Sequence, residues 1–498
     1  MRQTDSTKNN SVIKPLITML TAALFFAFIY DLSTESIKDA SYIFLIVCTV
    51  LILVLFRNRI SYTGTFFVML SGMILKLTYV IYTPVWCRQH DVVDFGAGEG
   101  HAAYIEYILE HRALPDFDPR SIWAFFQPPL HHVISAVWMW FNIRMKLPEA
   151  RIYKNVQILP LMYMCVLMYI VYLICRELCM KKGGTFITML IVSFHPIYIL
   201  MSGSINNDAL SVMLSVAAIY AAIIWYMYPT TARIILLGVL IGLAMMAKMS
   251  SALVAPPVAV MMVYKIMKDT GKLSDRTKVI SYVLELIAFA VVVFPLGLWW
   301  TIRNKILFGM GINYIPEVGE HVEKWGFVPT ILDVGTASPY LYMKSNGFVH
   351  DEYNMILACV KSSLFGEGDF ISLPQLITAF AWILFFANIA VIILWIISMI
   401  RTCIVSETGP DKGIKLFLVC TVISYVAGFV AFAVSGKNLS AMDFRYSAAT
   451  VAVMSVFLGL WYDRLGAVGG KTAKCVIMAV SGVFAASAAV FWILVGLA

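Results

Sequence analysis

The chain has 498 residues, of which 60% are hydrophobic and only 13% are charged, and its mean hydropathy is +0.82. Soluble domains are usually about half apolar and about a quarter charged, so this composition excludes an ordinary water-soluble fold and indicates lipid as the solvent. The formal net charge of +8 is modest, and its basic residues collect in short segments between apolar blocks. Such a pattern reports membrane orientation and gives no reason to expect a nucleic-acid partner.

The apolar residues form blocks that are long enough to cross a bilayer, since roughly 20 helical residues span a hydrocarbon core of about 30 Å. The first block is a full span with no small-residue cleavage pattern after it, so we expect no cleavable leader. We predict an all-α, polytopic membrane protein, a single integral membrane domain over residues 1–498. The thirteen predicted spans are 12–30, 41–56, 62–82, 158–175, 185–202, 208–226, 233–248, 251–266, 279–300, 375–400, 416–434, 446–461 and 475–496.

One further apolar stretch, residues 130–141, is about 12 residues long and too short to cross the bilayer. Counting it as a span would place Arg176, Lys181 and Lys182 outside, against the rule that short cytoplasmic loops are basic. We therefore predict an interfacial or re-entrant helix here. With the basic N-terminus in the cytoplasm, this topology puts the C-terminus on the exterior face.

Two long segments then lie outside: residues 83–157, with juxtamembrane helices, and residues 301–373. Long ordered loops are usually functional, so we expect the active site on this exterior face. Cys87 and Cys359 both fall in these segments. They are either free thiols or partners in a disulfide, which an exterior location permits.

The densest polar cluster is residues 90–101, directly after the third predicted span, with two aspartates, one glutamate and two histidines. Glycines within it let the backbone bend closely around a ligand. A carboxylate at this place can accept the proton that a sugar hydroxyl or an amine loses as it attacks an anomeric carbon. The alternative is a solvated acidic loop. The candidates are His90, Asp91, Asp94, Glu99 and His101, with Tyr104 on the predicted helix 101–111.

The stretch Gln127-Pro128-Pro129 precedes His131 and His132. Because proline suits the first turn of a helix, both histidines are expected at the start of the short helix, where they can bind a phosphate, a sugar or a metal. A metal site would combine them with other candidates of residues 90–101. That spacing matches no zinc pattern, so we expect no cofactor and keep a divalent metal as the alternative.

A third element, residues 202–208, is predicted to be an exterior turn between two spans. Asn207 and Asp208 are candidates for substrate contact. The alternative for Asp208 is a cap on the helix that follows it.

Four cations are predicted near the exterior membrane surface. Taken singly, each is explained by a side chain that reaches up to the interface, and Lys76 inside the third span is expected to do the same. Taken together they suit a lipid-linked phosphate, because fixed cations stabilise the charge that a phosphate leaving group gains. The four are Lys248, Arg303, Lys437 and Arg445.

In this order the features resemble the GT-C membrane glycosyltransferases, especially the family 39 type, which includes protein O-mannosyltransferases and lipid A aminoarabinose transferases. The resemblance covers roughly residues 60–460. It rests on His90-Asp91, Gly100 to Tyr104, Gln127-Pro128-Pro129-Leu130, Ser202 to Asp208, Ala247-Lys248, Trp299 to Asn304 and Arg445-Tyr446.

The resemblance implies transfer of a sugar from a polyprenyl-phosphate donor to a glycan, lipid or protein acceptor, at the outer face of a plasma membrane, and its bacterial relatives lead us to expect a bacterial one. It also implies inversion at the anomeric carbon, a carboxylate of the first loop as the base and no cofactor for the chemistry. Other functions compatible with the sequence are a transporter or flippase of lipid-linked glycans, and a ligase that moves a whole glycan.

The sequence departs from the family pattern at two places. The acidic pair that usually comes four residues before the helix tyrosine is replaced by Gly100 and His101. The carboxylates lie upstream, and we predict Asp91 as the base, with Asp94 second. A lysine of the family is replaced by Gln127, for which His131 or His132 is the expected substitute.

Overall fold

The computed structural model describes residues 62–89, 91–271, 273–312, 354–368, 372–404, 409–436, 439–466 and 470–498, with short pieces at 314, 316, 326, 328–333, 335, 337–341, 352 and 370. The predicted spans 12–30 and 41–56 lie outside these residues, so the count of thirteen stays a prediction. In the part that is described, all regular elements are helices, and eight apolar stretches are long enough to cross a membrane. A bent pair of helices raises this number to nine.

Each predicted span from 62–82 onward coincides with helical structure, so the predicted helical, multi-pass fold class is confirmed. The long stretches are α3 (Thr63–Tyr82), α6 with α7 (Glu149–Asn155, Ile158–Glu177), α10 (Asp208–Met227), η1 with α12 (Met249–Val254, Ala255–Asp269), α13 (Arg276–Phe308), α15 (Gln375–Ile404), α16 (Lys412–Gly436) and α18 (Lys471–Leu497). The bent pair is α8 (Lys182–Phe194) and α9 (Pro196–Gly203), and the shorter helices are α11 (Thr231–Ala247), α14 (Met355–Phe365) and α17 (Ala449–Arg464).

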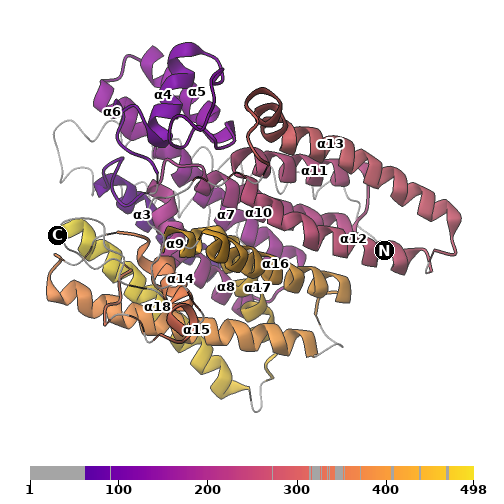
Figure 1. Cartoon of the computed structure of the whole chain (residues 1–498). Coiled ribbons are helices and arrows are strands. Elements are labelled where there is room, and N and C mark those ends of the chain that lie inside the picture. Colours follow the sequence, from indigo (N-terminus) through magenta and orange to yellow (C-terminus); the bar gives the residue numbers. More distant parts are fainter. Residues whose placement is uncertain are drawn as a thin grey trace.

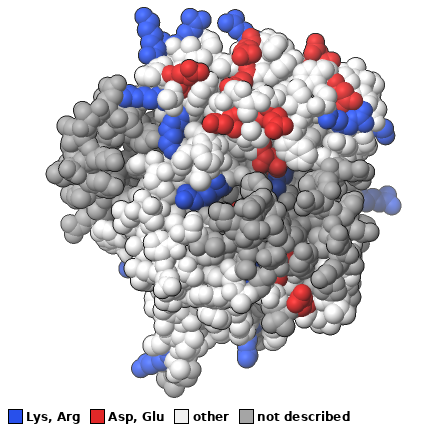
Figure 2. Space-filling model, turned by 60° about the vertical axis from the view of Figure 1, so that its left-hand side comes forward, with Lys and Arg blue, Asp and Glu red and all other residues white. Residues whose placement is uncertain are grey.

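Residues 83–157, which we call the cap, fold into α4 (Gly100–His111), α5 (Leu130–Arg144) and α6, and Figure 1 shows them gathered at one end of the molecule. The apolar stretch predicted to be interfacial or re-entrant is α5, which has 15 residues and packs against α4 and α6. On the face shown in Figure 2, charged side chains concentrate on the cap, while the helical body below is mostly uncharged. This division suits a body in lipid and a cap in water.

The body is built from helices that are paired along their lengths. α11 packs on α13 and α10, α17 packs on α8, and α15 packs on α18. Figure 1 shows α11, α12 and α13 extending together to one side, with α15 and α18 along the opposite edge. The cap meets the body where α3, α9 and α10 end or begin, so residues from many segments converge at that junction.

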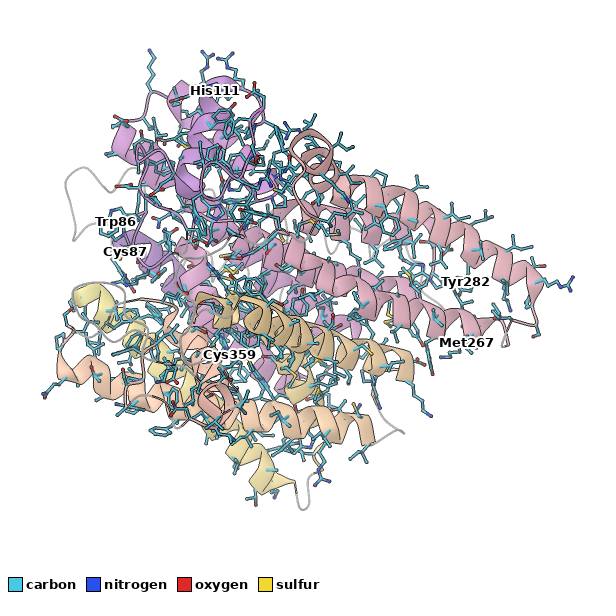
Figure 3. The ribbon with its side chains drawn as sticks, in the orientation of Figure 1. Trp86, Cys87, His111, Met267, Tyr282 and Cys359 are labelled. Atoms are coloured by element: carbon cyan, nitrogen blue, oxygen red, sulfur yellow. The ribbon has the colours of Figure 1, made fainter. Side chains whose placement is uncertain are left out.

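Of the two alternatives for Cys87 and Cys359, the structure shows free thiols and no disulfide between them. Figure 3 shows the two residues at separate places, Cys87 in the loop after α3 and Cys359 on α14. Cys359 packs instead against an apolar cluster that includes Phe429 and Ala433 of α16. The helix thus turns the thiol into the protein interior, away from Cys87.

Lys76 of α3 was predicted to reach the interface, and this prediction is wrong. Its side chain is wholly buried, and Nζ donates to the carbonyl oxygen of Ser193 at 2.7 Å. The bend of 47° at Pro196 frees that carbonyl, because the Ile197 N–H, its regular helical donor, turns to His195 Nδ1 instead. Lys76 therefore supplies the hydrogen bond that the bend removes.

Gly72 lies one helical turn before Lys76 and permits this contact, so we predict that Gly72→Ala destabilises the protein. A Cβ at Gly72 would lie 2.6 Å from both Cβ and the carbonyl oxygen of Ser193, which forces α3 away from α8. Overpacking of this kind costs about 1–3 kcal/mol. The check is the Tm of purified protein in detergent. Gly64→Ala on the same helix is the control, since its new Cβ would make only ordinary contacts of 3.5 Å with Phe186. Equal Tm values for both variants would contradict the argument.

Candidate active site

Four charged side chains from distant segments form one chain of alternating sign where the cap meets the body. The guanidinium of Arg445 lies between two carboxylates, with Nη2 at 3.8 Å from Asp91 Oδ2 and Nη1 at 3.7 Å from Asp208 Oδ2. The other oxygen of Asp208 is bonded to Lys248 Nζ. Two carboxylates and two cations thus balance one another in a partly enclosed place, which is the condition for burying charges.

The turn before α10 brings Asp208 and Lys248 together. Asp208 begins α10, and its N–H is bonded to Asn206 Oδ1 at 3.1 Å. Asn207 Nδ2 donates to the Ala247 carbonyl at 2.8 Å and to Gln127 Oε1 at 3.2 Å. These bonds tie the end of α11 to the start of α10. Because the backbone is extended at Lys248, its side chain turns from that end toward Asp208.

Arg445 lies in the short helix η4 (Phe444–Ser447), which begins with a cap by Asp443. Asp443 Oδ1 accepts a hydrogen bond from the Arg445 N–H at 2.6 Å, and Ser362 Oγ of α14 accepts one from the Phe444 N–H at 2.9 Å. The ring of Tyr446 lies 5.0 Å from the Arg445 guanidinium and 4.9 Å from Lys248 Nζ. One aromatic ring therefore helps to hold both cations near each other.

Asp91 is the open end of this chain. Its backbone adopts the left-handed region with φ 57°, and its carbonyl accepts a hydrogen bond from the His101 N–H at the start of α4 (2.8 Å). Trp123 Nε1 donates to Oδ1 at 3.0 Å. The Asp91 side chain is 38% exposed, whereas that of Asp208 is 6% exposed. Asp91 can therefore accept a proton from an incoming group, while Asp208 is enclosed by cations.

A small pocket, part of it open to solvent, adjoins the charge chain. Its lining includes the cations Arg88 and Arg445, the carboxylates Asp208 and Asp443, and Asn206. Sequence reasoning missed Arg88, whose one signal was its place directly before the acidic cluster. Two guanidinium groups at one pocket suit an anion with several oxygens, because arginine donates in a planar fork.

The predicted histidines lie beneath the site, in the interior of the cap. His101 Nδ1 and His132 Nε2 are 2.8 Å apart, and Tyr104 stacks on His132 with ring centroids 4.1 Å apart. His131 Nε2 is bonded to the Ile205 carbonyl at 2.7 Å. Burial lowers the pKa of His101 to about 3 and that of His131 to about 4, so both are neutral near pH 7. These rings join α4, α5 and the turn before α10.

Other predicted residues lie apart from the charge chain. Asp94 is exposed and accepts from the Phe95 N–H at 2.9 Å, and Glu99 is exposed at the start of α4. Arg303 donates to the Pro115 carbonyl at 2.5 Å and stacks on Trp300, so it joins α13 to the cap. His90 and Lys437 lie outside the described residues. Among the side chains that the structure describes, no three His, Cys, Asp or Glu converge as a metal site.

Residues 136–299 match the family model described as dolichyl-phosphate-mannose-protein mannosyltransferase. ArnT from Cupriavidus metallidurans, crystallised with undecaprenyl phosphate, is similar with a TM-score of 0.50 and 12% identity over 87% of this chain and 77% of that one. An oligosaccharyltransferase of Archaeoglobus fulgidus, solved with Zn and sulfate, gives a TM-score of 0.47 and 14% identity. That comparison covers 86% of this chain and 52% of the archaeal one. No curated protein matches the sequence.

The match over residues 136–299 and the similarity of the fold to that of ArnT agree with the resemblance to the GT-C membrane glycosyltransferases. At 12% identity the likeness to ArnT concerns the fold alone. What the chain does has to be argued from its own side chains.

The buried histidines predict a pH dependence of stability. Between pH 6.5 and about 4 the unfolded chain binds a proton at His131 and the folded chain does not, so the free energy of unfolding falls as the pH falls. Each such histidine contributes at most about 1.4 kcal/mol per pH unit. We expect a shallower fall of Tm with pH for His131→Gln, which keeps a donor for the Ile205 carbonyl. His111→Gln, at an exposed position, should keep the wild-type slope. Parallel curves for wild type and His131→Gln would contradict the assignment.

Proposed function

We propose that this chain is an inverting glycosyltransferase that moves a sugar from a polyprenyl-phosphate donor to an acceptor at the outer face of the membrane. The observation that carries the proposal is the charge chain of Asp91, Arg445, Asp208 and Lys248, with its one exposed carboxylate. A base and a group of cations at one junction are what this transfer requires. The GT-C fold and the undecaprenyl phosphate held by ArnT support the choice of donor class.

In the proposed reaction the acceptor hydroxyl or amine gives its proton to Asp91 as its lone pair attacks the anomeric carbon. The bond between that carbon and the phosphate oxygen breaks on the opposite face, and its electron pair leaves with the phosphate. Positioned acid–base groups of this kind contribute about 10²–10⁴-fold to a rate. Attack from the face opposite the phosphate inverts the configuration.

The cations act on the other side of the reaction. The phosphate gains negative charge as it leaves. Arg445 and Arg88 line the pocket beside the charge chain, and Lys248 is paired with Asp208, which also lines it. Asp208 holds Lys248 and Arg445 in place before the substrate binds. Because these donors are fixed in advance, little reorganisation is needed when the charge develops. The buried histidines act indirectly, by positioning α4 and the turn before α10.

We predict that Asp91→Asn lowers transfer by about 10²–10⁴-fold, because an amide cannot accept the acceptor's proton. Binding of the polyprenyl-phosphate donor should change little. The measurement is transfer of labelled sugar from a polyprenyl-phosphate donor by purified protein. Asp94→Asn is the matched control and should stay close to wild type, since its side chain accepts a hydrogen bond from the N–H of the next residue, Phe95.

Two outcomes would contradict this proposal. Full transfer by Asp91→Asn would remove the assigned base. Movement of lipid-linked sugar across proteoliposomes with no new glycosidic bond would indicate a transporter instead.

Lys248→Met is predicted to lower transfer by about 10²–10³-fold, because one donor to the leaving phosphate is lost. The single change also leaves Asp208 with less positive charge in a buried place, which destabilises the fold. The double variant Asp208→Asn/Lys248→Met removes both charges and should recover much of the Tm without recovering transfer. Lys305→Met, at an exposed position on α13, is the control for loss of a lysine. Recovery of transfer by the double variant would show that Lys248 acts only on stability.

A further inference from the structure

An aromatic surface lies beside Asp91, on the side of the carboxylate that does not face the cations. Trp123 and Phe126 pack edge to face with ring centroids 5.9 Å apart, and Phe126 packs against Tyr314 in the same manner at 5.6 Å. All three rings are partly exposed. The three rings form a row that begins at Trp123, next to Asp91, and we call this row the aromatic shelf.

The shelf is fixed by the residues beneath it. Phe125 is buried and stacks on Tyr104 of α4, with ring centroids 4.5 Å apart. Ala124 has φ 71°, a left-handed conformation that is uncommon for a residue with a side chain, and this turn lets Trp123 and Phe125 point to different sides. The Trp300 Nε1–H of α13 donates to the Phe126 carbonyl at 3.3 Å. Strained backbone that the surroundings hold in place is typical of functional sites.

The two oxygens of Asp91 face two different surroundings. Oδ2 lies 3.8 Å from Arg445, on the side of the cations and the pocket. Oδ1 accepts the Trp123 indole N–H at 3.0 Å. In an inverting transfer the leaving phosphate and the acceptor occupy opposite sides of the anomeric carbon. If the cations receive the phosphate, the shelf lies on the side from which the acceptor comes.

We propose that the aromatic shelf is the acceptor subsite and that the acceptor is a carbohydrate, with a pyranose ring lying on Trp123 and one of its hydroxyls directed to Asp91. This inference rests on the proposed function and names its acceptor class.

Sugar chemistry fits this surface. One face of a pyranose carries axial C–H groups, which pack on the negatively polarised face of an aromatic ring, while the equatorial hydroxyls project from the rim. A ring placed on Trp123 therefore leaves a hydroxyl free at its edge, where Asp91 Oδ1 lies. Pockets for small ligands commonly combine such an aromatic wall with a few placed polar groups.

The test measures binding without turnover. Full-length protein in lipid nanodiscs is mixed with a panel of methyl pyranosides and short oligosaccharides, and in parallel with short serine- and threonine-containing peptides, and saturation-transfer NMR is recorded. At least one glycoside is expected to receive saturation at its axial C–H protons. Trp123→Leu should weaken that binding about tenfold, and Trp123→Phe, which keeps a ring, should weaken it less. Trp86→Leu, at an exposed tryptophan in the loop after α3 that is not one of the shelf rings, is the control and should bind as wild type.

The results separate this inference from the proposed function. The inference is overturned if no glycoside gives a signal that depends on Trp123, or if a peptide gives such a signal and no glycoside does. Binding of undecaprenyl phosphate, measured on the same samples, should be the same in wild type and in Trp123→Leu. If that lipid does not bind while glycosides do, the donor class is wrong and the carbohydrate subsite stands.

Discussion

The arrangement of the site depends on the burial of one guanidinium. Arg445 is 7% exposed, and its charge is balanced by Asp91 of the cap and Asp208 of α10. Removing one partner of a buried ion pair costs about 3–5 kcal/mol, because the other charge is left without compensation. Arg445 therefore links the orientation of the cap to that of the helical body. The short helix that carries it is in turn fixed to α14 through Ser362.

Neutral histidines also hold the cap in place. The cap packs on the turn before α10 through His131 and on itself through the stacked pair of His101 and His132, whose pKa values are all held low by burial. A protonated ring in this interior would add a third cation next to Lys248 and Arg445. Uncharged histidines can lie close to those cations and still donate hydrogen bonds to backbone carbonyls. Because the histidines are neutral, the positive charge of the site is confined to the lysine and arginine side chains.

The sequence was sufficient for the spans that the structure describes, the cap and all four members of the charge chain, because hydropathy and charge bias act locally. Asp91, Asp208, Lys248 and Arg445 each lie beside the end of an apolar block, and helices that cross the same membrane bring such ends to one level. Trp123, Arg88 and the Lys76–Ser193 contact were not predictable, since each depends on a turn or bend that brings distant residues together. For the same reason the sequence left open whether Cys87 and Cys359 are free or paired, because no local pattern reports which way a thiol points.

The position of Gln127 illustrates how the site accommodates a change in one of its parts. The resemblance leads one to expect a lysine there, and the amide instead accepts a hydrogen bond from Asn207, which ties α10 to the end of α11. A lysine would have to lose that bond and would crowd Lys248 and Arg445 with a third cation. Arg88 lines the pocket beside the charge chain and lies next to the rings of Tyr82 and Phe370. In the proposed reaction the Arg88 guanidinium supplies the positive charge that the absent lysine would have given. The phosphate then lies between Arg88 and Arg445, and the two carboxylates of the charge chain stay paired with its two cations.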